Sequence, residues 1–283
     1  YCPEIGMSTP LVSVNMCVWR PHEVYFPQAV RSILDQTFED FELIIVEDPS
    51  EIDGRAMIAD LLGDPRIRYV QNPTRTGLVS QRNQALQLSR ADLVAVLDAD
   101  DVAKPHRLAT QIEYCTSHPD VSVLGSWLEI INSNGHPIGL RRYPTEHKLI
   151  AKTFRRYNPI AQPAVLFRRE LAQSVGAYRG EMYVEDFDLW CRMFKAGAHF
   201  ANIPEPLTSY RVHSASGTKA SHIRHVLQNT IRIKREYFGQ EMNLGDRLRL
   251  YGEICLTLLP PRLVLFLFQK LTFKSIPKRK PCR

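Results

Sequence analysis

The sequence predicts an α/β protein in which a mostly parallel, Rossmann-like sheet is flanked by helices and becomes mixed in its second half. Three observations lead to this fold class. Up to residue 101, short apolar runs rich in β-branched residues alternate with helical patterns. Those runs lack polar alternation, as expected of strands that are buried on both faces. After residue 101 the order changes, and an Asn-Gly pair indicates a hairpin.

The first half reads as strand and helix in turn. Residues 11–19 (LVSVNMCVW) are expected to form a buried strand, because Val12, Val14 and Val18 are β-branched. A helix at 26–36 leads into a second buried strand, ELIIVE. The remaining elements are expected as a helix at 55–62, a strand at 67–71, a helix at 78–88 and a strand at 93–97.

The second half begins with a helix at 104–117 that Pro105 opens, followed by a long strand at 121–131. The pair Asn134-Gly135 then predicts a hairpin turn. The later elements are expected as a strand at 163–168, a helix at 187–196 closed by Gly197, a strand at 206–212 and a basic helix at 223–238.

Composition restricts the class of protein. The chain has 283 residues, of which 44% are hydrophobic and 23% charged, which is typical of a globular protein and excludes disordered, collagenous and polytopic membrane chains. Its six cysteines are scattered without a C-x-x-C pair, which favours a reducing, cytoplasmic compartment. The first ten residues lack a basic start and an apolar run, so we expect no signal peptide.

The net charge of +6 comes from the C-terminal end, because residues 270–283 hold six basic residues and no acid. Subtracting these from 36 leaves 30 basic residues against 30 acidic ones, which argues against a nucleic-acid partner. The stretch 256–273 is apolar but too interrupted to span a bilayer. We expect an interfacial helix whose basic tail binds an anionic membrane surface. The alternative is a C-terminal helix packed on the core with a frayed end.

The segment Leu97-Asp98-Ala99-Asp100-Asp101 is the most informative part of the chain. Three carboxylates at the carboxyl end of a buried strand repel one another unless a cation neutralises them, and hard oxygen ligands suit Mg²⁺ or Mn²⁺. The alternative is a solvated turn that leads into a helix. Neither G-x-G-x-x-G nor G-x-x-x-x-G-K-[ST] is present, which argues against a dinucleotide-dependent oxidoreductase and a P-loop phosphotransferase.

Seven motifs in sequence order resemble those of family 2 glycosyltransferases with the GT-A fold. They are PLVSVNMCVW, SILDQTFEDFELIIVEDPS, GLVSQRNQAL, VAVLDADD, QPAVLFRRE, VEDFDLWCRM and YRVHSAS. The resemblance covers about residues 10–216. It implies a GT-A domain over 1–216, with a nucleotide-binding half at about 10–101 and an acceptor-binding half at about 102–216. Residues 217–283 would be a helical C-terminal extension.

The resemblance also implies donor-binding residues. Asp48 matches the acid that hydrogen-bonds the base, and Trp19 the aromatic beside it, which favours uracil or thymine. Arg82 is implied to contact the donor, and Asp98 to approach the ribose, with Ala99 next to it in the same turn. From the residues alone, Trp19 could equally be packed in the core, Asp48 could be a turn acid, and Arg82 could be a solvated helix charge.

The same resemblance assigns the metal and the base. Asp100, with Asp98 beside it, is implied to bind Mn²⁺ or Mg²⁺, and His213 to reach the metal or the diphosphate. Glu185 and Asp186 match the family's catalytic "ED" pair, whose aspartate is the expected general base. The alternatives are a helix cap for Asp186 and a surface or core position for His213.

The activity that the resemblance implies is inverting transfer of one sugar from a nucleotide-diphosphate sugar to a hydroxyl acceptor. The acceptor would be a glycan or a lipid-linked sugar in cell-surface polysaccharide or glycolipid synthesis, near the inner face of the cell membrane. Nucleotidyl transfer is a competing class, but no basic glycine-rich loop is visible near the amino end. A catalytically inactive nucleotide-sugar-binding module that docks on a membrane assembly is the non-enzymatic alternative.

Overall fold

The structure is a computed structural model that describes residues 9–180, 183–213, 222–261, 263–264 and 267. The strands are β1 (Val12–Val18), β2 (Phe41–Glu47), β3 (Ile67–Gln71), β4 (Leu93–Val96), β5 (Val102–Ala103), β6 (Val121–Ile131), β7 (Pro137–Arg141), β8 (Leu166–Arg168) and β9 (His199–Arg211). The α-helices are α1 (Tyr25–Leu34), α2 (Gly54–Met57), α3 (Leu78–Leu88), α4 (Arg107–Ser117), α5 (His147–Thr153), α6 (Arg169–Ser174), α7 (Glu185–Lys195), α8 (Ile223–Phe238) and α9 (Leu244–Leu256). Two 3₁₀ turns are η1 (Gln162–Ala164) and η2 (Gly239–Glu241).

One nine-stranded sheet runs through the described part of the molecule in the order β3-β2-β1-β4-β8-β6-β9-β5. The first four strands in that order are parallel, which confirms the parallel first half. Beyond them β8 is antiparallel to both β4 and β6, while β9 is parallel to β6. The sheet is therefore mixed in its second half, as predicted.

The predicted hairpin is present. β7 pairs with β6 in antiparallel register, so that Leu128 lies opposite Arg141. In the turn between them Gly135 has φ +80, which a residue with a side chain rarely adopts. Asn132 also accepts the backbone N–H groups of Asn134 and His136 through its side-chain oxygen.

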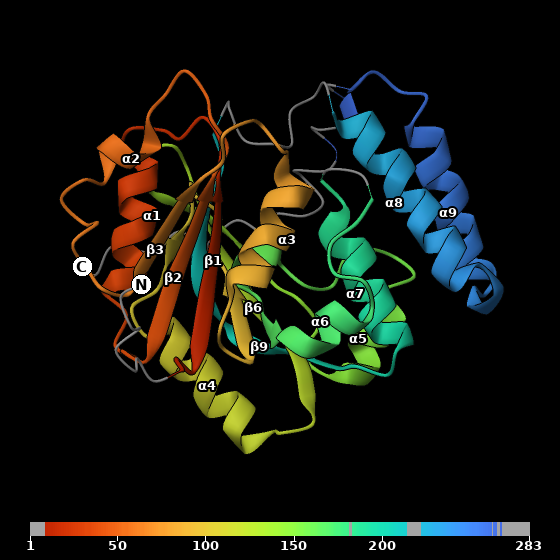
Figure 1. Ribbon diagram of the computed structural model, residues 1–283. Coiled ribbons are helices and arrows are strands. Elements are labelled where there is room, and N and C mark those ends of the chain that lie inside the picture. Colours follow the sequence, from red (N-terminus) through yellow and green to blue (C-terminus); the bar gives the residue numbers. More distant parts are fainter. Residues whose placement is uncertain (1–8, 181–182, 214–221, 262, 265–266, 268–283) are drawn as a thin grey trace, which may run out of the picture.

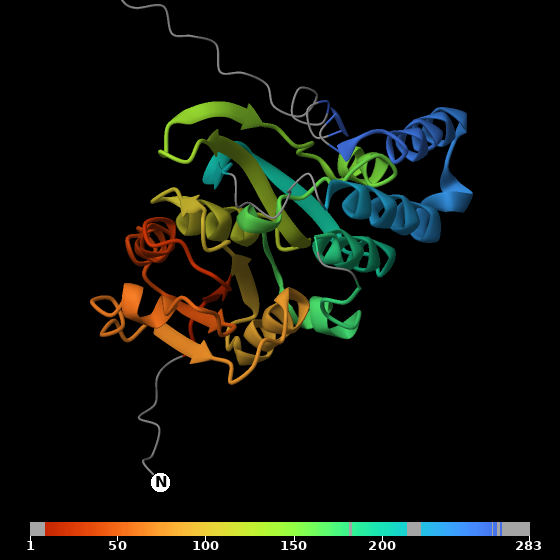
Figure 2. The same cartoon turned by 90° about the horizontal axis from the view of Figure 1, so that it is seen from above.

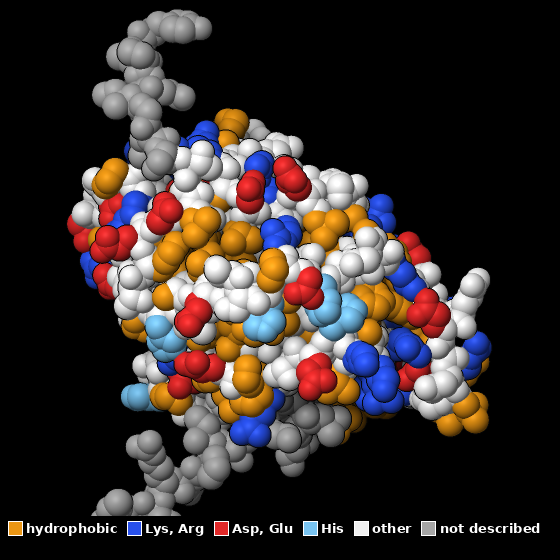
Figure 3. Space-filling view, turned by 90° about the horizontal axis from the view of Figure 1, so that it is seen from below, with side chains coloured by type: hydrophobic (Ala, Val, Ile, Leu, Met, Phe, Trp, Pro, Cys, Tyr) orange, Lys and Arg blue, Asp and Glu red, His pale blue; other side chains and the backbone are white. Residues whose placement is uncertain are grey.

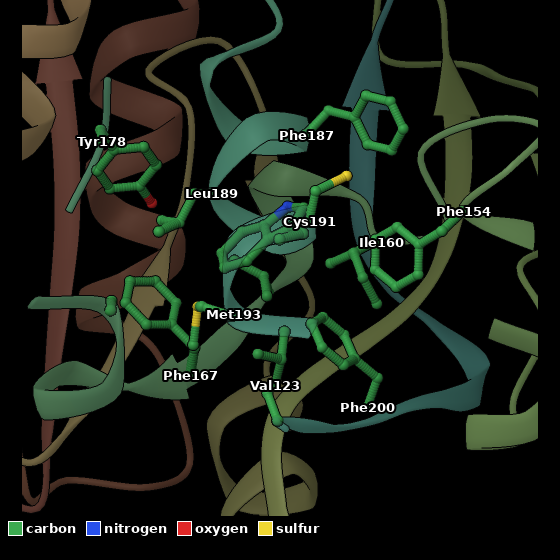
Figure 4. Packing of buried hydrophobic residues seen from close by; sticks show 14 of the residues in the cluster. Val123, Phe154, Ile160, Phe167, Tyr178, Phe187, Leu189, Cys191, Met193 and Phe200 are labelled. Atoms are coloured by element: carbon green, nitrogen blue, oxygen red, sulfur yellow. The ribbon is translucent and has the colours of Figure 1, made fainter. Parts of the chain in front are cut away.

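Two apolar layers cover the sheet. On one face, α1 and α4 bury a cluster that includes Val14, Phe26 and Leu108. On the other face, α3, α5, α7 and α8 share a second cluster, in which Phe187 packs with Phe154. Figure 4 shows this second layer closely packed around the α7 side chains. Both faces of the central strands are buried, which explains why those strands show no polar alternation.

Several predicted bounds were wrong. The helix expected at 55–62 ends at Met57. From Ile58 onward, most backbone N–H groups donate to the carbonyl three residues before them, as in a 3₁₀-helix, and Pro65 follows. The strand expected at 206–212 begins at His199 and passes two prolines through register shifts opposite Ser126 and Trp127. The segment expected as a strand at 163–168 starts with η1, and only Leu166–Arg168 is a strand.

The expected helical extension contains a second helix, α9, whose bounds were not predicted. Asn243 caps α9, since its side chain accepts the N–H of Asp246 at 2.8 Å. Half of the predicted interfacial segment at 256–273 and all of the basic stretch at 270–283 lie outside the described residues. No helix in the described ranges is long and apolar enough to cross a membrane.

Candidate active site

The acidic turn after β4 forms the centre of the candidate site. The N–H of Asp101 donates to the carbonyl of Asp98 at 3.2 Å, which closes the turn at the carboxyl end of the strand. Asp100 Oδ2 lies 2.9 Å from Nε2 of His213, which follows β9. The structure thus brings together two of the predicted metal ligands from segments far apart in the sequence.

Arg211 holds this turn in place, and sequence reasoning missed it. Its backbone N–H donates to Asp101 Oδ1 at 2.8 Å, and its Nε donates to the carbonyl of Asp100 at 2.8 Å. Its Nη2 reaches Gln28 Oε1 at 3.0 Å, and the guanidinium lies 4.3 Å from the Tyr25 ring centroid. The only signal in the sequence was its position two residues before His213.

Arg82 joins the acidic turn to the predicted catalytic pair. It comes from α3 and is buried, with Nε 3.2 Å from Glu185 Oε1 and Nη2 3.6 Å from Asp98 Oδ1. Burial disfavours its charged form, but Glu185 and Asp98 outweigh this and raise the pKa of Arg82. One guanidinium therefore spans the two groups of acids, and it is not a solvated helix charge.

Asp186 lies in the first turn of α7, next to Glu185. It does not cap the helix, since the N-cap is Val184 without a side-chain bond. Asn158 Nδ2 donates to Asp186 Oδ2 at 2.8 Å, while Asn158 Oδ1 accepts the N–H of Ile160 at 3.2 Å. The second bond fixes which end of the amide faces Asp186. Asn158 was also missed, because an Asn-Pro pair signals only a turn.

Electrostatics separate these acids from ordinary surface carboxylates. Partial burial and repulsion from Glu185 raise the pKa of Asp186 to about 7, against attraction by Arg82. Burial also raises the pKa of Asp98 to about 6, again with Arg82 opposing the shift. Burial and the neighbouring acids Asp100 and Asp98 raise the pKa of Asp101 well above its usual range. Such shifts are typical of sites where acids exchange protons or bind cations.

The predicted base-binding residues lie at the ends of β1 and β2. Trp19 is 40% exposed, and its ring lies 3.8 Å from the Arg75 guanidinium carbon. Asp48 is buried, and its oxygens accept hydrogen bonds from the side chain of Asn72 and from the backbone N–H groups of Thr76 and Gly77. These bonds outweigh burial and lower the pKa of Asp48. A contact between Asp48 and a base remains a prediction, while Trp19 is exposed and not a core residue.

The residues that would hold a divalent cation are few but suitable. Among the described residues, no three or more His, Cys, Asp or Glu side chains are grouped so that they could hold a metal ion by themselves. Asp100 and His213 still provide an oxygen and a nitrogen within hydrogen-bond distance of each other, and Asp100 is half-buried. Mg²⁺ is commonly bound by one or two protein ligands together with substrate phosphates and water. The pair therefore fits a cation that is shared with a diphosphate.

The predicted site residues lie together at one edge of the sheet. The DxD turn, including half-buried Ala99, lies against Arg82, and Arg82 lies against Glu185. On the opposite edge, where Val121 and His199 begin β6 and β9, a groove of about 350 Å³ is lined by several histidines and acids. Figure 3 shows histidines and acidic side chains near one another on that face. None of the predicted site residues lines this groove.

Comparison with known proteins gives a consistent result. The family described as Glycosyl transferase family 2 matches residues 13–176. The O-antigen biosynthesis glycosyltransferase WbnJ of Escherichia coli is 30% identical over 227 residues, which cover 75% of this chain and 83% of that protein.

Two solved structures have a similar fold. One is Staphylococcus aureus TarS with UDP-GlcNAc, at a TM-score of 0.63 and 15% identity, covering 86% of this chain and 79% of that chain. The other is the mannosyltransferase PcManGT of Pyrobaculum calidifontis with GDP-Man and Mn²⁺, at a TM-score of 0.61 and 15% identity, covering 93% of this chain and 81% of that chain. At such identities the likeness shows the GT-A fold.

Proposed function

Because the chain belongs to glycosyltransferase family 2, we propose that it moves a single sugar from a nucleotide-diphosphate sugar to a hydroxyl acceptor. One observation supports this most: Arg82 contacts both Asp98 and Glu185, so the acidic turn lies beside Asp186. A donor held at the turn would present its anomeric carbon near a carboxylate that can accept a proton. We assign the donor to residues 10–101, the acceptor to 102–216 and an extension to 217–283.

UDP- and dTDP-sugars are the donors we favour. The exposed ring of Trp19 can stack on a base, and Arg75 lies over the same ring. Asp48 supports this site by fixing the loop that contains Thr76 and Gly77. Asp48 already accepts four hydrogen bonds, because the hydroxyl of Thr76 donates to it as well, so a ring N–H of uracil or thymine would have to replace one of them. TarS binds UDP-GlcNAc, which is consistent with a uridine donor.

In the mechanism we propose, Asp186 is the general base. As the acceptor oxygen attacks the anomeric carbon, its proton passes to Asp186, and Asn158 keeps the other carboxylate oxygen occupied. The new carbon–oxygen bond forms while the bond to the β-phosphate oxygen breaks, and that bond's electron pair leaves with the nucleoside diphosphate. A single displacement of this kind inverts the anomeric centre. Glu185, paired with Arg82, fixes the start of α7 and so the position of Asp186.

Asp100 and His213 are the residues that would hold Mn²⁺ or Mg²⁺, with Asp98 beside them. When bound, such a cation neutralises negative charge on the leaving diphosphate. PcManGT was crystallised with Mn²⁺, which supports metal use by this fold. We predict that Asp100→Ala weakens UDP binding at least tenfold in the presence of Mn²⁺ and has little effect without it. Calorimetric titrations with and without Mn²⁺ test this, and equal affinities in all four experiments would contradict the metal assignment.

We place the reaction in the synthesis of a cell-surface polysaccharide or glycolipid at the inner face of the cell membrane. WbnJ is named for O-antigen biosynthesis, which supports a glycan or lipid-linked acceptor. The basic stretch at 270–283 would contact an anionic membrane surface. The second candidate function, an inactive nucleotide-sugar-binding module, would retain donor binding without any transfer.

The test is to measure release of nucleoside diphosphate from UDP-, dTDP- and GDP-sugars with Mn²⁺ and a panel of glycan acceptors. The proposal predicts release that depends on the acceptor and is fastest with a UDP- or dTDP-sugar. A protein that binds a donor but releases no diphosphate with any acceptor of the panel would favour the inactive module.

A further inference from the structure

The outward face of α9 is unusually apolar. α9 lies on the far side of α8 from the sheet, at the outer edge of the molecule (Figures 1 and 2). Leucines and a tyrosine recur on it at helical spacing, with one more leucine just past its end, so they share one side. We call the following residues the α9 stripe: Leu244 (74% exposed), Leu248 (63%), Tyr251 (66%) and Leu258 (80%).

The inward side of the same helix carries Leu250, which packs against the core, and two acids that are paired with basic residues. Glu253 accepts a hydrogen bond from the buried Lys234 of α8 at 2.6 Å. Asp246 is buried beside Arg155 and Arg156, with its oxygens 3.7 and 3.4 Å from their nitrogens. A surface helix usually turns its apolar side toward the core, whereas α9 turns only Leu250 inward and leaves the stripe exposed. Exposed leucines in a row therefore indicate contact with something other than water.

The exposed charges of the α8–α9 hairpin that carries the stripe are mostly basic. Acidic side chains of the α8–α9 hairpin are largely neutralised by cations, with Glu236 as an exposed exception. The exposed basic residues of the hairpin are Arg224, Arg232 and Arg235 on α8 and Arg247 on α9, while exposed Arg249 pairs with Glu253 at 3.4 Å on the inward side. After residue 267 the sequence adds six more basic residues and no acid. An apolar stripe with a basic border matches an anionic bilayer surface.

We propose that the α9 stripe lies on an anionic lipid bilayer, with its leucines in the headgroup boundary and its arginines on lipid phosphates. This rests on the membrane partner of the proposed function, and it assigns that contact to a folded, described surface. A second copy of the chain fits less well, because a dimer along this face would bring two basic stretches of the same sign together. The basic stretch at 270–283 of the same chain is also an unsuitable occupant, because charged side chains do not bury leucines.

The position of the stripe suits a membrane-bound acceptor. Arg224 Nη2 donates to the carbonyl of Leu259 at 3.3 Å, which ties the end of α9 to the start of α8. α8 begins ten residues after His213 of the candidate site. In Figure 1 the C-terminal end of α9 lies at the same edge as the carboxyl ends of β1 and β2. The C-terminal end of the stripe therefore lies at the edge of the molecule that carries the candidate site, while the rest of the stripe runs along the outer side.

The experiment is cosedimentation of the full chain with phosphatidylcholine vesicles and with vesicles that also contain phosphatidylglycerol. We expect binding to the anionic vesicles only, decreasing as salt rises. The double variant Leu248→Ser, Leu258→Ser should lower the partition coefficient about tenfold for each leucine. Leu11→Ser, which changes a 45% exposed leucine at the start of β1, is the matched control and should bind as the wild type does.

Each other outcome overturns the proposal. If the wild type binds neither vesicle, there is no bilayer contact, and if the double variant binds as well as the wild type, the contact lies elsewhere. A molecular mass that doubles with concentration, and that the double variant abolishes, would assign the face to a second copy. Transfer to a soluble acceptor and the melting temperature should be unchanged, which separates this test from that of the proposed function. Arg247→Gln tests the basic border independently and should also weaken binding.

Discussion

Asp186 has surroundings that set the pH at which it can accept a proton. Partial burial and the charge of Glu185 disfavour its ionised form, while Arg82 and the amide of Asn158 favour it, and the balance raises its pKa to about 7. The other ionisable groups that interact with it are Tyr143, Tyr178 and Cys191. Because a general base acts only when deprotonated, turnover should rise with pH through about 7.

We predict that Asn158→Ala moves this limb of the pH profile upward by about one pH unit. The amide donates to the ionised carboxylate, so its loss favours the protonated form and raises the pKa of Asp186. The measurement is kcat over a range of pH for the wild type and the variant. Below the raised pKa of Asp186, kcat of the variant should be lower than that of the wild type. At high pH, part of the lost kcat should return.

Asn134→Ala is the matched control, since this exposed asparagine lies in the β6–β7 turn. Its pH profile should superimpose on that of the wild type. If Asn158→Ala lowered turnover equally at every pH, Asn158 would act only on the fold and would not set the ionisation of Asp186.

At the residue scale, the motifs predicted the acids of the site better than the groups that orient them. Asp98, Asp100 and Asp186 belong to short acidic patterns at the ends of apolar runs, which a sequence displays directly. Asn158 and Arg211 act through contacts with residues at least 28 positions away. The periodicity of a sequence does not reveal contacts between distant residues, so Asn158 and Arg211 could be found only from the structure.

At the element scale, Arg107 fixes the carboxyl end of β4, where the acidic turn begins. It is fully buried in α4, and its guanidinium donates to the carbonyls of Val96, Pro163 and Val165 at 2.8, 2.8 and 3.2 Å. These carbonyls belong to the crossing point between β4, η1 and β8. Burial in this position lowers the pKa of Arg107 to about 9.

We predict that Arg107→Met lowers the free energy of unfolding by about 3 kcal/mol, because three buried carbonyls each lose a hydrogen bond. Pro163 and Val165 keep one other donor each, the hydroxyl of Thr208 and the N–H of Val96. Urea denaturation followed by circular dichroism measures this. Arg31→Met is the control: Arg31 forms an exposed ion pair with Asp60, and its loss should cost less than about 1 kcal/mol. Equal effects of the two substitutions would contradict the role given to Arg107.

Elements with strong local patterns were predicted with their observed bounds. β3, β6, α3 and α8 are examples, because apolar spacing and turn residues mark both of their ends. β9 was predicted too short, since Pro206 suggests a strand start and only bulges opposite β6 allow the strand to continue. No helix was predicted at the residues of α9, because Gly245 and Gly252 weaken its helical pattern.

At the scale of the whole molecule, the sheet brings two halves of the chain to one edge. Parallel strands β1, β2 and β4 end at the acidic turn and at Asp48, and antiparallel β8 then allows β6 and β9 to continue the sheet. α7 covers the second half and begins with Glu185 and Asp186. Arg82 links the two halves, because it forms ion pairs with Asp98 of the first and Glu185 of the second. The mixed character of the sheet was predicted, but the strand order was not, because it depends on pairings between distant segments.

We propose above all that Asp186 accepts the proton of the acceptor hydroxyl, while other residues bind the sugar donor. The most direct measurement is turnover and UDP affinity in the same preparation of Asp186→Asn, with Asp60→Asn, a surface substitution, as the control. We predict that turnover falls by about two to four orders of magnitude while UDP affinity stays within a factor of about two. Full turnover in Asp186→Asn would contradict the claim, and loss of UDP binding along with turnover would place Asp186 in the donor site instead.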